Sequence, residues 1–158
     1  PHDAHSRGIE HGNLMPANAM IDWAASRVTL TDLGLARLAD AERTRTGLVL
    51  GSPAYMAPEL LAGFDASAST DLYALGVLLF QLLCGRLPFE ADAVGALLRD
   101  VAQTAAPALR SIRPEAGPGL DALVRDLLAK TPANRPPNAR AVAERLTALS
   151  HDPSELGA

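Results

Sequence analysis

The chain has 158 residues, of which 48% are hydrophobic and 20% are charged, so it is long enough for one globular domain with a sizeable core. Its formal net charge of −4 argues against a protein that binds nucleic acid or an anionic membrane surface. The single cysteine, Cys84, excludes a disulfide framework within the chain and indicates a reducing compartment, so we expect a cytoplasmic location.

The first part of the chain is predicted to be mostly loop, with two short strands. A helix is expected to end at Gly8. The segment AMID at 19–22 is predicted as one strand and Val28–Thr31 as a second, because apolar and polar residues alternate there. The DWAAS segment between them suits a hairpin turn. Residues 32–57 are predicted as a long polar loop, and a loop of that length in a compact domain is usually functional or disordered.

The pattern becomes helical from Pro58, which suits the first turn of a helix. Ser69–Asp71 is predicted to cap a helix over Leu72–Cys84 that ends at Gly85. This helix is apolar on nearly all sides, so it is predicted to lie at the buried centre of the domain. Proline-rich joins separate three further amphipathic helices, predicted over 93–103, 120–130 and 139–150.

The predicted fold class is therefore mainly α, with one or two small β-hairpins near the N-terminal end. The apolar run 72–84 contains Gln81 and is too short for a membrane span, so we expect no membrane contact from this segment. Residues 151–158 are predicted to form a disordered tail.

Several short motifs follow one another in a fixed order. Each is weak alone, but their combined order and spacing resemble the C-terminal lobe of the protein kinase family. The segment GSPAYMAPE is similar to the bacterial, eukaryotic-like Ser/Thr branch of that family. The motifs are HGNLMPAN at 11–18, Asp32-Leu33-Gly34, GSPAYMAPE at 51–59, Asp71 to Gly76, and Arg135 after Lys130-Thr131-Pro132.

The resemblance implies a kinase-like C-lobe over residues 1–150. We expect the family's N-lobe to lie upstream of Pro1 and to be absent from this chain, which on its own is then expected to be inactive. The family uses Mg²⁺ and ATP, and these are the expected cofactors once an N-lobe is present.

The resemblance also assigns cofactor-binding residues. Asp32 and Asn18 match the two metal-binding positions of the family, and their oxygen atoms suit the hard Mg²⁺ ion. Met20 matches the floor of the adenine pocket. Without this context, Asp32 would be interpreted as a turn residue and Met20 as a core residue.

The catalytic loop departs from the family pattern HRDLKPxN at neighbouring positions. Asn13 stands where the family has its catalytic aspartate, and an amide does not accept a proton near neutral pH. Met15 stands at the lysine that neutralises the transferring phosphate, and Gly12 at the arginine that contacts a phosphorylated loop. Ser52 matches a residue that contacts this base and lysine, so these changes put its role in doubt.

The remaining matches are structural. His11 and Leu33 resemble members of the family's regulatory spine. Asp71 resembles the aspartate that accepts hydrogen bonds from the catalytic-loop backbone, although an ordinary first-turn acid would also suit the helix dipole. Glu59 and Arg135 resemble the family's buried ion pair.

Three functions remain open from the sequence. The first is a pseudokinase that binds Mg-ATP but is impaired in phosphoryl transfer, and the second is an active or weakly active Ser/Thr protein kinase. The third is a kinase-shaped scaffold with no nucleotide role. The expected partners are a protein substrate or a regulated partner kinase, and no nucleic acid.

Overall fold

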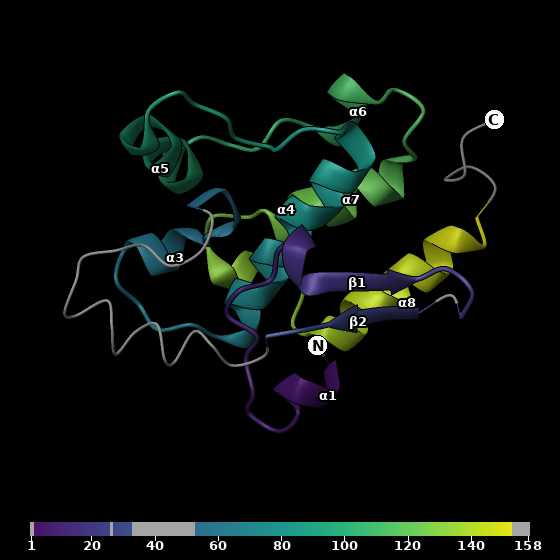
Figure 1. Ribbon diagram of the computed structural model, residues 1–158. Helices are drawn as coiled ribbons and strands as arrows, with labels where there is room; N and C mark the ends of the chain where they lie inside the picture. The colour runs from purple at the N-terminus through teal and green to yellow at the C-terminus, as the bar shows by residue number, and fades with distance from the viewer. Residues whose placement is uncertain (1, 26, 33–52, 153–158) are drawn as a thin grey trace.

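The computed structural model describes residues 2–25, 27–32 and 53–152 (Figure 1). Within these residues the chain is mainly helical and has one two-stranded antiparallel sheet, which confirms the predicted fold class. The helices are α1 (His2–His5), α3 (Pro58–Leu61), α4 (Ala68–Cys84), α5 (Val94–Gln103), α6 (Leu109–Ile112), α7 (Pro118–Leu127) and α8 (Ala139–Ser150); the strands are β1 (Ala19–Asp22) and β2 (Arg27–Leu30); the 3-10 turns are η1 (Pro16–Asn18), η2 (Pro53–Tyr55) and η3 (Pro132–Asn134).

The predicted hairpin is present, with its second strand one residue earlier than expected. Ala19 pairs with Leu30 and Asp22 with Arg27. At the turn, the Asp22 Oδ1 atom accepts a hydrogen bond from the Ala25 N–H at 3.0 Å, which is typical of an aspartate that starts a tight turn. The bounds of β2 are set by its pairing with β1, and the alternation of residues within one strand carries no information about that pairing.

Helix α4 begins earlier than predicted. Its N-cap is Ser67, and Ser67 and Thr70 form a reciprocal capping box. The prediction of a cap within Ser69–Asp71 is therefore wrong, because these residues already lie in the first turn. The predicted C-terminal end is confirmed: Gly85 adopts φ +71° and its N–H bonds to the Gln81 carbonyl.

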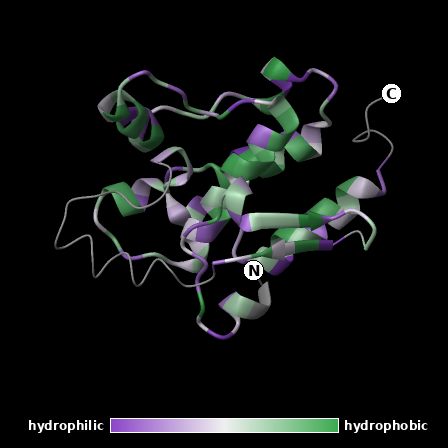
Figure 2. Cartoon of the chain, in the orientation of Figure 1, coloured by the Kyte–Doolittle hydropathy of each residue, from purple (hydrophilic) through white to green (hydrophobic). Residues whose placement is uncertain are grey.

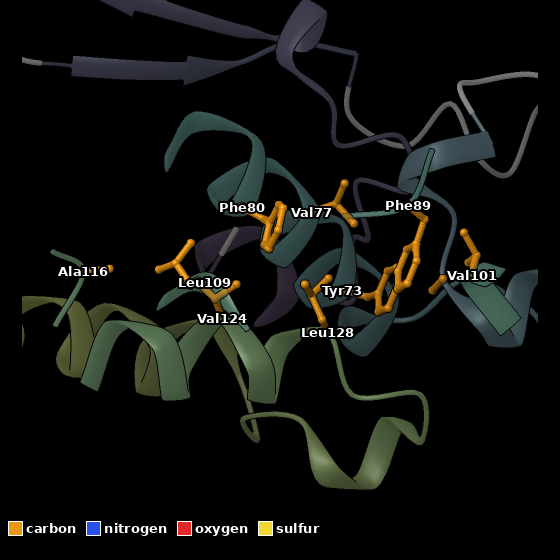
Figure 3. Close-up of a cluster of buried hydrophobic side chains, with 10 residues drawn as sticks. Tyr73, Val77, Phe80, Phe89, Val101, Leu109, Ala116, Val124 and Leu128 are labelled. Carbon is orange, nitrogen blue, oxygen red and sulfur yellow. The ribbon is translucent and has the colours of Figure 1, made fainter. Parts of the chain in front are cut away.

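The core forms around α4, which lies in the middle of the molecule with α3 and α5 on one side and the hairpin and α8 on the other (Figure 1). Helix α4 is hydrophobic along most of its length (Figure 2), whereas α7 combines apolar residues with Asp121, Arg125 and Asp126. One buried cluster packs residues of α4 against the following helices, and a second joins α4, α7 and α8. The first includes Tyr73, Val77, Phe80, Val101, Leu109, Val124 and Leu128 (Figure 3), and the second includes Leu72, Leu123, Leu127, Ala139 and Val142.

The later helices match their predictions to different degrees. Helix α8 has the predicted bounds and α5 starts one residue late. Helix α7 starts earlier than residue 120, because Pro118 occupies its first turn. It ends at Leu127, before residue 130. The one-turn helix α6 was not predicted. None of the helices in the described ranges is long and apolar enough to cross a membrane.

Candidate functional site

The segment 11–18 is held on the central helix α4 by one buried carboxylate. Asp71 is 3% exposed. Its Oδ2 atom accepts a hydrogen bond from the His11 N–H at 2.7 Å, and its Oδ1 atom accepts one from the Gly12 N–H at 2.7 Å. Asp71 therefore fixes the backbone of this loop directly, in addition to lying in the first turn of α4.

A second group, His5, joins this arrangement from the end of α1. Its Nε2 atom lies 2.8 Å from Asp71 Oδ2, and its side chain is almost fully buried. For a hydrogen bond to form with a carboxylate, the His5 ring must carry its proton on Nε2. The carboxylate thus connects α1, the loop and α4.

His11 is also buried, at 2% exposure. Its Nδ1 atom accepts a hydrogen bond from the Asn13 N–H at 3.3 Å, so the neutral ring carries its hydrogen on Nε2. That Nε2 atom is buried and has no partner among the described residues. The ring therefore fixes the Asn13 backbone and leaves a donor pointing into the interior.

Asn18 ties the end of the loop back to Asn13. Its Nδ2 atom donates to the Asn13 carbonyl at 2.8 Å, and the residue is 8% exposed. Since the amide nitrogen is engaged there, the orientation of the side chain is set and its Oδ1 atom is the free acceptor end; no described residue donates to it. Asn13 and Met15 are both partly exposed, on either side of the buried Leu14.

The hairpin places Asp32 close to Asn18. The Thr31 N–H donates to the Asn18 carbonyl at 2.9 Å, which extends the β1–β2 pairing by one position. Asp32 follows directly, is exposed, and has φ +60°, a conformation that aspartate tolerates better than most residues. The Asn18 amide and the Asp32 carboxylate therefore lie at the same end of the hairpin.

The Asn18 amide oxygen and the Asp32 carboxylate are oxygen ligands that fit Mg²⁺, because Mg²⁺ takes oxygen ligands and is usually held by one or two protein groups together with phosphates and water. Within the described ranges there is no group of three or more His, Cys, Asp or Glu residues that would hold a metal by itself. Asn18 and Asp32 therefore suit an ion that arrives with a phosphate ligand better than a structural metal.

Met20 lies on β1 and is 62% exposed, beside the exposed Ile21 and opposite Thr29. Its predicted role in an adenine pocket remains a prediction, as does the role of Asp32. Leu33 and Ser52 lie outside the described residues, as does most of the predicted loop 32–57 and of the tail 151–158.

Glu59 and Arg135 form a bidentate ion pair that joins α3 to the segment after η3. The Arg135 Nη1 and Nη2 atoms lie 2.6 Å and 2.8 Å from the two Glu59 oxygens. Burial raises the pKa of Glu59, but the hydrogen bonds and charge of Arg135 and the hydrogen bond from Thr70 more than offset it and lower that pKa. Arg135 also donates to the carbonyls of Ser69 and Ala129 at 2.9 Å each.

Sequence reasoning did not predict the network contacts of three residues. They are His5, which shares Asp71; Thr70, which donates to Glu59 at 3.2 Å while its side chain accepts the Ser67 N–H in the capping box; and Lys130, which contacts α5. A buried histidine or threonine has no periodic signal in a single sequence. The one indication for His5 in the sequence was its position in a predicted helix end that directly precedes the loop 11–18.

Comparison with known proteins supports one assignment. A family model described as the protein kinase domain matches residues 2–147. The chain is 37% identical over 161 residues to the serine/threonine-protein kinase pkn3 of Myxococcus xanthus, which covers 95% of this chain and 29% of that protein. It is 41% identical over 139 residues to the serine/threonine-protein kinase PknJ of Mycobacterium tuberculosis, covering 84% of this chain and 23% of that protein.

A third relative is the DNA damage-responsive serine/threonine-protein kinase RqkA of Deinococcus radiodurans. It is 37% identical over 144 residues, which cover 90% of this chain and 21% of that protein. The chain thus spans less than a third of the length of each of these curated relatives.

Proposed function

The chain belongs to the protein kinase domain family, and from this premise we propose that residues 1–150 form a Ser/Thr-kinase-like domain that binds Mg-ATP but is impaired in phosphoryl transfer. One observation carries the proposal: Asp71 holds the loop 11–18 in place, yet Asn13 and Met15 stand at its two reactive positions. The framework of the site is kept and the groups that would react are changed.

Asn13 is proposed to orient a substrate hydroxyl without removing its proton. Its amide donates and accepts hydrogen bonds but is not a base near neutral pH, and loss of a general base typically costs about 10²–10⁴-fold in rate. Met15 carries no charge, so the developing negative charge of the transition state is not stabilised from that position. Both changes act on the transfer step, and neither removes a proposed metal ligand.

Asn18 and Asp32 are the residues proposed to hold the metal ion of Mg-ATP. When bound, Mg-ATP supplies the phosphoryl group and the positive charge that neutralises its oxygens. Asn18 contributes an amide oxygen whose orientation is set by the Asn13 carbonyl, and Asp32 contributes a carboxylate. Met20 is proposed to contact the base.

The proposed substrate class is a serine or threonine hydroxyl on a protein, and the proposed partner of an impaired domain is another kinase whose activity it regulates. The proposed location is the cytoplasm. The proposed substrate and partner derive from the kinase family and from relatives whose names state Ser/Thr kinase activity. The proposed location derives from the single cysteine.

A thermal-shift titration with ATP, with and without Mg²⁺, tests the proposal. It is carried out on this chain and on the longest reading frame that encodes it. A ligand that binds only the folded state raises its stability, by about 2.7 kcal/mol at a concentration of one hundred times Kd. We expect a Mg²⁺-dependent rise in Tm that is lost in Asp32→Ala and kept in Asp65→Ala, which changes an exposed acid before α4.

A well-folded protein with no Mg²⁺-dependent shift would reject the nucleotide proposal and favour a kinase-shaped scaffold. A shift accompanied by rapid transfer of labelled phosphate to protein, with Asn13 unchanged, would reject the impairment and favour an active kinase.

A further inference from the structure

Gly12 is the point at which the loop 11–18 leaves its anchor on α4. The N–H groups of His11 and Gly12 donate to the two oxygens of Asp71, each at 2.7 Å, so the peptide group that precedes Gly12 is held in place. A peptide group is planar and rigid, and only φ and ψ rotate freely at each residue. The backbone dihedrals of Gly12 therefore set the direction in which the chain continues to Asn13.

The backbone of Gly12 is left-handed, with φ at +71°. Directly after it, the Asn13 N–H turns back and donates to His11 Nδ1 at 3.3 Å. Glycine adopts a positive φ without cost, whereas an L side chain brings its Cβ too close to the following carbonyl oxygen. Among the described residues, Asp32 is the only other type of residue with a positive φ. The conformation at position 12 therefore favours glycine.

Two hydrogen bonds carry the conformation of Gly12 as far as the proposed metal ligand. The first, from the Asn13 N–H to His11, fixes where the Asn13 peptide lies. The second joins the Asn13 carbonyl to the Asn18 Nδ2 atom at 2.8 Å and so orients the Asn18 amide. A change in the dihedrals of Gly12 moves the Asn13 carbonyl and removes the contact that directs the Asn18 oxygen.

Gly12 also stands where the family resemblance places an arginine. An arginine there would supply a cation, but its Cβ would have to adopt the left-handed conformation. The contacts of the loop with Asp71 are made by backbone N–H groups, so they require no side chain at position 12. Glycine thus gives up a charged contact and removes backbone strain from the loop.

We propose that Gly12 is a positioning residue of the site. Its left-handed backbone directs the loop from its anchor on Asp71 so that the Asn13 carbonyl orients the Asn18 amide, and no side chain at position 12 is needed. As a consequence, restoring the arginine of the family pattern loosens the loop instead of repairing the site. The role of Gly12 in Mg-ATP binding rests on the proposed function, whereas its role in the order of the loop does not.

The test compares Gly12→Asn, Gly12→Ala and Gly12→Arg by hydrogen exchange of backbone amides, followed by NMR. Asparagine tolerates a positive φ better than alanine does, although its side chain is larger. If the backbone conformation decides, Gly12→Asn is the mildest of the three variants. If space around the side chain decides, Gly12→Ala is the mildest. The order of these two variants therefore separates a conformational role from crowding.

We expect the His11 and Asn13 amides to exchange about 5–30-fold faster in Gly12→Ala and Gly12→Arg than in the original chain, relative to the core amides of α7. This factor corresponds to the cost of one left-handed L residue. Gly12→Asn should stay within about 3-fold of the original chain. The α7 amides report global unfolding, so the ratio isolates the local effect.

Gly63→Ala is the matched control. Gly63 follows α3, has φ at +87°, and no atom lies within 4 Å of an added Cβ, so its substitution imposes the same kind of backbone strain away from Asp71. It should leave the ratio of loop to α7 exchange unchanged. A change of that ratio equal to the change in Gly12→Ala would mean that the loop responds to any loss of stability, and would overturn the proposed role.

A second arm measures the Mg²⁺-dependent rise in Tm with ATP in the longest reading frame. We expect Gly12→Asn to keep this rise and Gly12→Ala to reduce it. Faster loop exchange in Gly12→Ala with an undiminished rise would overturn the link from Gly12 to Asn18. If the original protein shows no rise, the nucleotide proposal fails, and the exchange data still decide whether Gly12 orders the loop.

Two exchange results would overturn the positioning role itself. One is slower loop exchange in Gly12→Ala than in Gly12→Asn, which would show that space and not φ governs position 12. The other is slower loop exchange in Gly12→Arg than in the original chain, which would show that the loop gains order from a side chain at this position.

Discussion

Asn13 differs from an aspartate only in its amide, yet this position separates the proposed functions. Its backbone is fixed on both sides, since its N–H donates to His11 Nδ1 at 3.3 Å and its carbonyl accepts from Asn18 at 2.8 Å. The Asn13 side chain takes part in neither of these hydrogen bonds. A carboxylate can therefore be introduced there without disturbing the loop, which makes the chemistry of this residue testable by substitution.

We expect Asn13→Asp to raise phosphoryl transfer in the full reading frame, and Asn13→Asp with Met15→Lys to raise it further, by about 10²–10⁴ in total. The measurement is transfer of labelled phosphate to a generic protein substrate. Asn138→Asp, which changes the N-cap of α8, is the control for the added charge. Unchanged transfer in the double variant, despite Mg-ATP binding, would show that the transfer defect does not lie at these two positions.

Tyr73 presents a different question at the same scale. The residue is fully buried, and its hydroxyl has no hydrogen-bond partner among the described residues. Its ring nevertheless packs in the core and lies 5.0 Å from the Arg135 guanidinium carbon. Burial raises the pKa of the hydroxyl, so it stays neutral at any ordinary pH. The ring contributes to packing and the hydroxyl contributes a desolvation cost.

Tyr73→Phe is therefore expected to leave the free energy of unfolding unchanged or to increase it by up to about 1 kcal/mol, since an unsatisfied buried polar group is removed. Urea denaturation measures this directly. Tyr55→Phe is the matched comparison, because the Tyr55 hydroxyl donates to Gln81, and it should destabilise by roughly 0.5–1.5 kcal/mol. A clear loss of stability in Tyr73→Phe would mean that the hydroxyl has a partner.

At the scale of elements, the contact between α4 and α7 depends on Gly76. A Cβ atom at this position would lie 2.8 Å from the Leu127 Cβ and 3.2 Å from Leu128 side-chain atoms. Such a short contact with Leu127 forces the helices apart, because close-packed cores do not absorb an extra methyl group without strain. The glycine allows α7 to approach the centre of α4, where both core clusters meet.

Gly76→Ala is expected to destabilise the fold by about 1–3 kcal/mol from overpacking, despite the roughly 1 kcal/mol that alanine gains over glycine in helix propensity. Gly95→Ala in α5, where no atom lies within 4 Å of the added methyl, should be neutral or stabilising. The denaturation midpoint should therefore fall in Gly76→Ala and should not fall in Gly95→Ala. A stabilising Gly76→Ala would contradict the close approach of α4 and α7.

At the scale of the whole molecule, the Glu59–Arg135 pair joins α3, the start of α4 and the segment that leads into α8. Thr70 links the pair to the capping box of α4, and the contact of the Arg135 guanidinium with the Tyr73 ring links it to the core. A buried pair of this kind contributes little net stability relative to an apolar replacement, but it is costly to break by removing one partner, by about 3–5 kcal/mol.

Glu59→Gln should lower stability near neutral pH by about 3–5 kcal/mol, measured by denaturation across a pH series. Because the folded-state pKa of Glu59 is lowered, its contribution is fully present above the unfolded pKa and is lost as the pH falls through the folded pKa. The difference between the original chain and Glu59→Gln should therefore shrink in acid. Glu90→Gln, at an exposed position, should show neither effect, and a pH-independent difference would mean that Glu59 acts through packing alone.

The sequence by itself determined the family, the helical class, the central position of α4 and the ends of α8, because apolar periodicity, helix-ending glycine and motif order are local properties of the chain. Only the tertiary structure decided the start of α4 at Ser67, the register of β2, the approach of α7 at Gly76 and the partners of Asp71. Several hydroxyl residues could each have capped α4; Ser67 does so, and Thr70, its partner in the capping box, also donates to Glu59 of α3. His5 and Lys130 gain their roles from contacts with residues 66 and 29 positions away in the chain, and such contacts leave no pattern that a single sequence could display.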